Sequence, residues 1–247
     1  MPEVIRAEHA SQAGHWYTTG GEPAYEIVGK GGKVRNTTLR DARQLKLVPS
    51  VTTIIREAAA PGLQNWKDTQ LILACLTMPR IDEESEEDYI AKIRSDAGAH
   101  AKAAAERGTQ IHAYIQEGFE GKTLTGEALE FFESAWNTVY AECGDEQWEC
   151  ETSFATDKYG GKIDLISDRY LLDIKTTEKP IDGLKTWDNH HQQLAAYDLT
   201  GKRKCGIVYV NTINKQSRLI WVDDEDIVRG RKCFLALLDY FYARTGL

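Results

Sequence analysis

Two neighbouring segments of the sequence place acidic and basic side chains beside short apolar runs. Residues 160–164 end in Asp164, and residues 171–177 contain Asp173 and Lys175. Because side chains on a strand alternate between its two faces, Asp173 and Lys175 would point to the same side. Asp164 lies on the preceding strand of the expected hairpin, so two carboxylates and one lysine can meet there. Such oxygen ligands suit Mg²⁺ or Mn²⁺, and a nearby lysine can stabilise charge developing on a phosphate.

A charged and solvated hairpin face is the alternative interpretation of the same residues. Asp173 and Lys175, however, interrupt an apolar run that is typical of a buried central strand. Burying unpaired charges in such a strand would cost several kcal/mol. A bound metal ion would offset that cost, so the segment favours a metal site.

Four other residues add to this set. His112 falls on an expected helix, where it is either a metal ligand or a structural histidine. Gln193 and Tyr197 are spaced to lie one turn apart on one face of a helix, which is also an ordinary helix surface. Glu151 lies on the strand before the hairpin, two residues after Glu149, and could equally be an exposed carboxylate.

Taken together and in this order, the motifs resemble the PD-(D/E)xK nuclease superfamily, and most nearly its RecB-type and phage exonuclease branch. The shared pattern is Gly-Thr-x-x-His, Glu, Gly-x-x-Asp, Asp-Ile-Lys-Thr and Gln-x-x-x-Tyr, within residues 104–200. A Pro-Ser-Val-Thr-Thr segment at 49–53 is similar to one in phage exonucleases and in the mitochondrial genome maintenance exonuclease.

The resemblance implies a role for each matching residue. His112, Asp164 and Asp173 would be metal ligands, with the Ile174 carbonyl as a backbone ligand, and Lys175 would be the catalytic lysine. Glu151 would bind metal or hold the attacking water, although Glu149 competes for that position. Gln193 and Tyr197 would support the lysine or contact DNA phosphate.

The order of the expected elements predicts a mixed α/β fold. The expected strands are about 148–154, 162–166, 171–176, 204–212 and 218–222, preceded by a hairpin of 25–28 with 33–35; the expected helices are about 39–47, 50–59, 63–76, 86–119 in two pieces, 126–143, 189–199 and one from 224. The resemblance implies a restriction-endonuclease-like core, a mixed central sheet flanked by helices. We expect residues 101–247 to form this core and residues 1–100 to pack on it as a hairpin and helical region that walls a DNA channel.

Composition excludes several classes of protein. The 247 residues are 42% hydrophobic and carry a net charge of −8, which argues against a disordered, collagen-like or coiled-coil chain. No apolar run approaches the roughly 20 residues of a membrane span, and the first residues lack a signal-peptide pattern, so we expect a cytoplasmic protein, in the host cytoplasm if phage-encoded. The five scattered cysteines predict buried free thiols.

One stretch of the amino-terminal region is basic despite the acidic total. It contains five cationic residues: Arg35, Arg40, Arg43, Lys46 and Arg56. They either hold a DNA strand near the metal or only make the surface soluble.

These observations predict a Mg²⁺-dependent DNA exonuclease, with Mn²⁺ able to substitute. Its partners would be linear DNA ends, including single strands, and a phage single-strand annealing or binding protein, in phage recombination or DNA processing. The alternatives are a structure-specific or restriction-like endonuclease and a catalytically silent DNA-binding module. Cleavage polarity, strand preference, the number of metal ions and the oligomeric state stay open.

Overall fold

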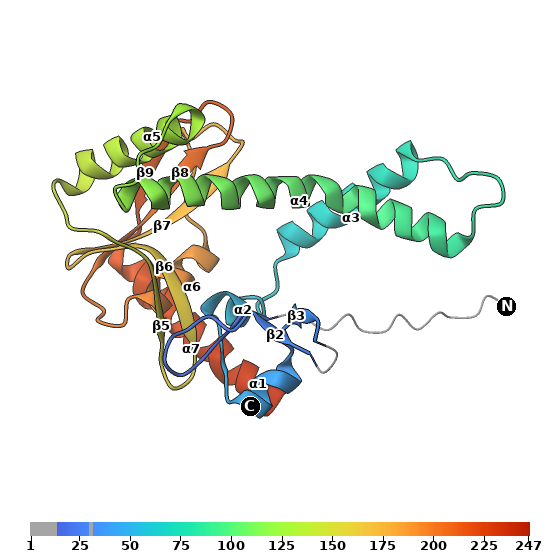
Figure 1. The fold of residues 1–247 in the computed structure, drawn as a ribbon, viewed down its shortest axis with the longest axis horizontal. Coiled ribbons are helices and arrows are strands. Elements are labelled where there is room, and N and C mark those ends of the chain that lie inside the picture. Colours follow the sequence, from blue (N-terminus) through green and yellow to red (C-terminus); the bar gives the residue numbers. More distant parts are fainter. Residues whose placement is uncertain (1–13, 30–31) are drawn as a thin grey trace.

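The computed structural model describes residues 14–29 and 32–247, and a five-stranded sheet forms its centre (Figure 1). The strands follow one another across the sheet in chain order: β5 (Glu149–Ala155), β6 (Gly160–Ile166), β7 (Tyr170–Thr177), β8 (Lys204–Asn211) and β9 (Ser217–Trp221). All neighbours are antiparallel except β7 and β8, which are parallel. A parallel pair needs a crossover, and the helix α6 (Asp188–Tyr197) provides it. The predicted mixed α/β fold is confirmed.

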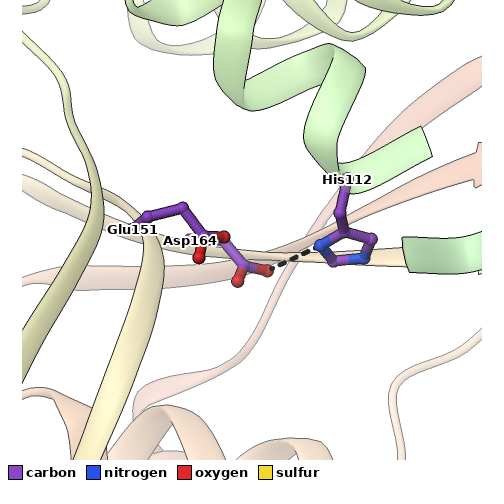
Figure 2. A group of neighbouring side chains, drawn as sticks. All are labelled: His112, Glu151 and Asp164. Atoms are coloured by element: carbon purple, nitrogen blue, oxygen red, sulfur yellow. Dashed lines mark ion pairs between the residues drawn. The ribbon is translucent and has the colours of Figure 1, made fainter. Parts of the chain in front are cut away.

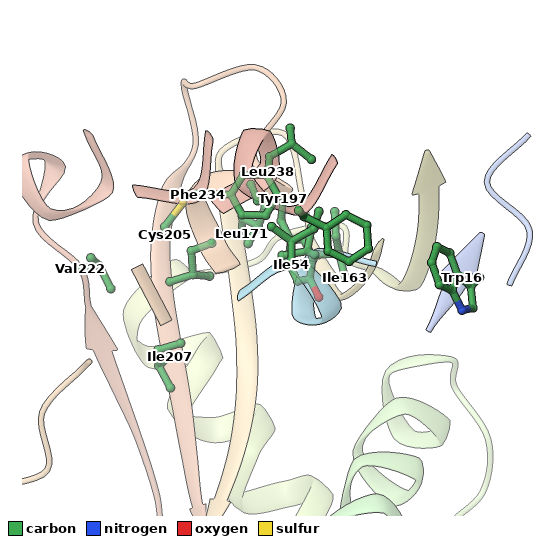
Figure 3. Close-up of a cluster of buried hydrophobic side chains, with 14 of the residues drawn as sticks. Trp16, Ile54, Ile163, Leu171, Tyr197, Cys205, Ile207, Val222, Phe234 and Leu238 are labelled. Atoms are coloured by element: carbon green, nitrogen blue, oxygen red, sulfur yellow. The ribbon is translucent and has the colours of Figure 1, made fainter. Parts of the chain in front are cut away.

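Helices cover both faces of this sheet. On one face, α6 packs with α7 (Asp224–Thr245) and the short α2 (Val51–Ile55). The buried side chains of this layer include Ile54, Leu171 and Phe234, as Figure 3 shows. On the other face lie α5 (Gly126–Cys143) and the carboxy-terminal part of α4 (Glu86–Phe119), whose Ile111 and Ile115 are fully buried.

The elements that precede α2 contribute buried side chains, such as Trp16 and Ala42, to the core of the α6–α7 layer. They are β1 (Trp16–Tyr17) paired with β4 (Val48–Pro49), the hairpin of β2 (Glu26–Val28) and β3 (Val34–Asn36), and the helix α1 (Leu39–Leu45). The hairpin turn at residues 30–31, like the amino-terminal segment 1–13, lies outside the described residues. Trp16 joins the same core cluster as Ile54, which fixes these elements to the sheet.

The helix α2 begins where the sequence predicts and ends earlier. Ser50 is its N-cap, because its hydroxyl accepts a hydrogen bond from the Thr53 N–H at 3.0 Å. The helix was expected to reach Ala59 but ends at Ile55, and this expectation was wrong. The next helix already begins at Pro61, so the chain must leave the helical conformation before this proline.

The helix α4 is a single element of 34 residues, so the prediction of two pieces was wrong. Gly98 was expected to weaken it, but alanines surround this position and favour the helix. Gly108 has a packing role instead, since a Cβ there would lie 2.9 Å from the Thr176 hydroxyl of β7. The domain boundary expected near residue 100 falls inside this continuous helix.

The helix α3 (Pro61–Thr77) and the amino-terminal half of α4 form an arm that extends away from the sheet (Figure 1). Its helices meet at few buried positions, chiefly Ala74 and Ile93. Leu76 is 78% exposed, so most of the apolar surface of α3 faces outward. Within the described residues, no helix combines the length and hydropathy needed to cross a bilayer. All five cysteines are free, as predicted, but the expectation that they are buried was wrong for Cys75 and Cys233, which are exposed on helices.

Candidate metal and phosphate site

The strands β6 and β7 separate at the position of Asp164. Their ladder has only two paired positions, Leu165 with Leu172 and Ile166 with Leu171. Beyond them the Ile174 N–H has lost a strand partner, and it donates instead to Asp164 Oδ2 at 2.7 Å. A buried backbone donor left unpaired would be costly, so the Asp164 carboxylate takes the place of the missing ladder bond. This fixes one acidic group in the opening between the two strands.

Three groups capable of binding a metal ion lie together at this opening (Figure 2). One ligand atom each from His112, Glu151 and Asp164 lies within 4.8 Å of the others. His112 comes from α4, and its Nδ1 is 3.8 Å from Asp164 Oδ2. The structure thus brings together residues from a helix and two strands that are far apart in the sequence.

Glu151 reaches this group through an unusual backbone conformation. Its φ is +51°, in the left-handed region that glutamate rarely adopts, although Cys150 and Thr152 on either side keep their pairing with β6. The register places Glu151 opposite Asp164. Glu149, the competing candidate, is exposed at the start of β5, so Glu151 is the acid that joins Asp164. Backbone strain of this kind costs about 1–3 kcal/mol and gathers at functional sites.

A second set of side chains is connected by hydrogen bonds beside the first. Asp173 Oδ2 lies 2.6 Å from the Lys175 ammonium, as expected for two side chains on one face of β7. Gln193 donates to Asp173 Oδ1 at 2.7 Å and to the Tyr197 hydroxyl at 3.1 Å, and its carbonyl accepts from Lys175 at 3.3 Å. The amide of Gln193 therefore holds the aspartate and the lysine in fixed relation.

Burial and neighbouring charges shift the pKa values of the acidic and basic groups at the site. Burial, and then the neighbouring carboxylates Asp173 and Glu151, raise the pKa of Asp164 well above its usual range, against the opposing effects of Lys175 and the Ile174 N–H. Burial lowers the pKa of Lys175, but the charges of Asp173 and Asp164 outweigh it and hold this pKa above its ordinary value. The lysine is therefore a fixed positive charge, and a further cation would stabilise the ionised acids.

Two other groups of the site stay neutral at ordinary pH. Burial is the main reason that the pKa of His112 is lowered, which favours the neutral imidazole that metals bind. The Ile174 carbonyl is close enough to this ring to oppose the shift. Burial raises the pKa of the Tyr197 phenol well above its ordinary value, so this hydroxyl remains a hydrogen-bonding group.

Two glycines allow the surrounding elements to approach the site. A Cβ at Gly161 would lie 2.7 Å from the Tyr197 ring, and one at Gly160 would lie 2.8 Å from Tyr17. Both contacts are too short for a real side chain. The Gly160-Gly161 pair therefore lets α6 and β1 pack directly on the start of β6.

The eight residues singled out from the sequence thus fall into two adjoining groups. His112, Glu151 and Asp164 form the first, and Asp173, Lys175, Gln193 and Tyr197 form the second, while the Ile174 backbone lies between them. Asp173 is outside the three-residue group, because Gln193 and Lys175 contact its two oxygens.

Sequence reasoning missed two residues at the edge of the first group. Lys162 forms an ion pair with Glu151, and its place in the Gly-Gly-Lys motif was a usable signal. Tyr17 lies near enough for the Glu151 charge to add to the rise in the pKa of this tyrosine, whose main cause is burial. Nothing in the sequence connects Tyr17 with residues more than 130 positions away.

The five cations of the amino-terminal region are all exposed. Arg35 binds Asp41 at 2.6 Å, and the Asp41 carboxylate also accepts from the Thr38 N–H in the capping box of α1. Arg43 donates to the carbonyl of Thr245. Two of the five therefore have structural contacts. Arg40, Lys46 and Arg56 keep the DNA-holding role as a prediction.

Comparison with known proteins adds two distant likenesses. No protein-family model and no curated protein matches the sequence. Among solved structures, the chain is similar to an alkaline exonuclease (LHK-Exo) from Laribacter hongkongensis, with a TM-score of 0.36 and 17% identity over 74% of this chain and 94% of that one. It is also similar to a protein named SSO0001, with a TM-score of 0.28 and 17% identity over 71% and 86% of the two chains. Likenesses this distant say nothing about reacting residues.

Proposed function

We propose that this protein is a metal-dependent nuclease that hydrolyses phosphodiester bonds in DNA. The observation that carries the proposal is the site at the opening between β6 and β7. There a histidine and two carboxylates lie within 4.8 Å of one another, beside a lysine held by Asp173 and Gln193. Acids whose charges repel one another, next to a fixed cation, suit a divalent ion and a phosphate group.

The donor atoms at the site fit Mg²⁺ or Mn²⁺. Carboxylate oxygens and a neutral imidazole suit these ions. Burial, and then the charge of Asp173, raise the pKa of Asp164, and a bound cation would favour its ionised form. His112, Glu151 and Asp164 would hold the ion, and Asp173 and the Ile174 carbonyl stay predicted ligands. When bound, the ion would polarise the phosphate and increase the acidity of a water molecule.

The residues of the second group have separate roles in this proposal. Lys175 places its charge where the non-bridging phosphate oxygens become more negative, which lowers the barrier. Gln193 holds the side chains of Lys175 and Asp173 in fixed relative positions, and its amide takes part in three hydrogen bonds. Tyr197 accepts a hydrogen bond from Gln193, and its ring packs closely against Gly161.

The finer proposal is an exonuclease of the phage recombination or DNA-processing type that acts at linear ends. Its support is the motif order in the sequence, including the Pro-Ser-Val-Thr-Thr segment that resembles one in phage and mitochondrial exonucleases. A phage annealing or binding protein as partner, and a place in the host cytoplasm, belong to the same proposal.

Digestion of DNA tests the proposal. Linear DNA labelled separately at its 5′ and 3′ ends, in duplex and single-stranded form, is compared with closed circular DNA in Mg²⁺, in Mn²⁺ and in EDTA. We expect metal-dependent release of labelled nucleotides from linear DNA only. Cleavage of closed circles would instead assign an endonuclease, and binding without digestion in either metal would assign a silent DNA-binding module.

A further inference from the structure

The cavity beside the start of α6 lies outside the site described above. It has a volume of about 460 Å³, which is within the usual range for small-ligand sites. Its lining combines an aromatic face, aliphatic side chains and charges of both signs: Leu184, Lys185, Thr186, Trp187, Asp188, His191, Ile220, Asp226 and Arg229. A mixture of this kind suits a ligand with a flat apolar face and a polar edge.

The Trp187 indole is exposed although its backbone is held firmly. The side chain is 63% exposed. The Trp187 carbonyl accepts hydrogen bonds from the N–H groups of His190 and His191 at 2.8 and 3.1 Å. Just before it, the Lys185 carbonyl accepts from the Tyr209 hydroxyl at 2.9 Å. An exposed indole on a backbone held in this way can stack on a flat ring.

His191 supplies an independent sign of a ligand. The residue is only 5% exposed, and its Nε2 contacts the Thr186 hydroxyl at 2.8 Å. Its Nδ1 is buried without a hydrogen-bond partner and faces Asp226, whose nearest oxygen is 3.8 Å away. Buried polar atoms are nearly always paired, so this nitrogen and the nearby carboxylate are suited to contact a polar ligand in the cavity.

The cavity and the proposed reaction site are formed by neighbouring segments of the chain. The segment 178–187 leaves β7 shortly after Lys175 and enters α6, which carries Gln193 two residues after the cavity residue His191. His190, between the two places, is buried, and the charge of Lys175 adds to burial in lowering the pKa of His190 to about 4. The helix α6 thus connects the cavity to Lys175, whose ammonium donates to the Gln193 carbonyl.

We propose that this cavity binds an unpaired nucleobase of the DNA strand that enters the reaction site, with Trp187 stacked on the base. The polar edge of the base would meet His191 and Asp226, since carboxylates accept hydrogen bonds from base amino groups. Lys185 would contact the neighbouring phosphate. An aliphatic side chain of a protein partner would leave the buried His191 nitrogen unpaired, so a base fits better. This inference rests on the proposed nuclease function.

Binding in EDTA tests the inference without hydrolysis. The full chain is titrated against a labelled single-stranded oligonucleotide, and Trp187→Ala is compared with Tyr140→Ala. Tyr140 is a matched control, because it is 52% exposed on α5, at the other face of the sheet. Trp187→Ala should weaken binding about tenfold, the usual effect of losing one base–aromatic stack, and Trp187→Phe should weaken it less. Tyr140→Ala should leave the affinity within twofold of the wild type.

Abasic substitutions identify the base. Each oligonucleotide of a series lacks one base, at a different position. One member should bind the wild type more weakly than the intact oligonucleotide does, and this loss of affinity should be absent in Trp187→Ala. An equal affinity of wild type and Trp187→Ala, or a penalty that persists in the variant, would overturn the inference. If the wild type digests DNA but Trp187→Ala binds DNA as tightly as the wild type, the inference fails and the nuclease proposal stands. A wild type that neither binds nor digests DNA would remove both.

Discussion

The two faces of β7 carry opposite kinds of chemistry within one strand. Leu172 and Ile174 face the α4–α5 layer and join the apolar cluster of Ile111 and Ile115. On the α6 side, Leu171 is buried, but Asp173 and Lys175 follow it as an ion pair. The first face contributes stability through buried area, whereas the second contributes charges that burial makes costly.

The difference shows that the α6-facing side of β7 carries charged groups that are costly to bury but suited to chemistry. A fully apolar α6 face would be easier to bury, yet an aspartate that is 2% exposed sits in the central strand. Gln193 donates a hydrogen bond to one oxygen of this aspartate, and the Lys175 ammonium forms an ion pair with the other. Substitutions on the two faces should therefore separate activity from stability, and the following experiments test that separation.

The largest expected effect is the loss of activity in Asp173→Ala. Digestion of linear DNA in Mg²⁺ should fall below detection, since the substitution removes a predicted metal ligand and the partner of Lys175. The free energy of unfolding without metal should change little in comparison, because like charges near Asp164 are relieved. Digestion and urea unfolding are measured on the same preparation. Substantial Mg²⁺-dependent cleavage by this variant would contradict the proposed site.

Lys175→Ala should reduce digestion by about 10²–10³-fold, the range for loss of one transition-state donor. Mn²⁺ affinity should survive or increase, since a nearby positive charge is removed. Calorimetric titration with Mn²⁺ measures this affinity, and Lys232→Ala, which removes an exposed lysine of α7, is the control. Loss of Mn²⁺ binding in Lys175→Ala would make the lysine a structural requirement for the metal site.

On the apolar face, Leu172→Ala should lower the free energy of unfolding by about 2–5 kcal/mol, the cost of a cavity in a core. Leu76→Ala in the exposed arm is the matched control and should change it by at most about 0.5 kcal/mol. Urea unfolding of both variants measures the contrast. A comparable loss in Leu76→Ala would show that the arm is buried in solution.

Asp164→Asn should stabilise the metal-free protein as pH rises. The pKa of Asp164 is raised in the folded state, so the wild type loses stability as pH increases from the ordinary carboxyl pKa through this raised value. The amide cannot ionise, and it can still accept the Ile174 N–H bond. The gain near neutral pH should be roughly 1–3 kcal/mol, since one pKa unit equals about 1.4 kcal/mol. Unfolding curves from pH 4 to 9 measure it, and a constant difference would contradict the raised pKa.

The smallest expected effect on hydrolysis comes from reversing Arg40, Lys46 and Arg56 to glutamate. DNA binding should weaken and its dependence on salt should flatten, because fewer counterions are released on binding. The rate at saturating DNA should change less than the affinity. Titrations at several salt concentrations measure both quantities. An unchanged affinity and slope would assign these residues to the solvated surface.

Local patterns in the sequence were sufficient for much of the fold. Alternation within residues 171–177 predicted that Asp173 and Lys175 share a face, and the N-cap at Ser50 was confirmed. These features depend on neighbours within a few residues, where strand and helix periodicities act. Gly98 and Gly108 misled the prediction for α4, because a glycine penalty of about 1 kcal/mol is small beside a long alanine-rich helix.

The residue types and their order determined the chemistry: two acids and a lysine on adjacent strands, with a histidine, a glutamate and a Gln-x-x-x-Tyr pair elsewhere. Only the tertiary structure decided how they group. The separation of β6 from β7 turns Asp164 toward the Ile174 N–H, and the positive φ of Glu151 brings that residue, rather than Glu149, to His112. Tyr17 joins the same place from β1. The physical reason is that strand separation, backbone strain and long-range packing depend on contacts between distant segments, which no local periodicity encodes.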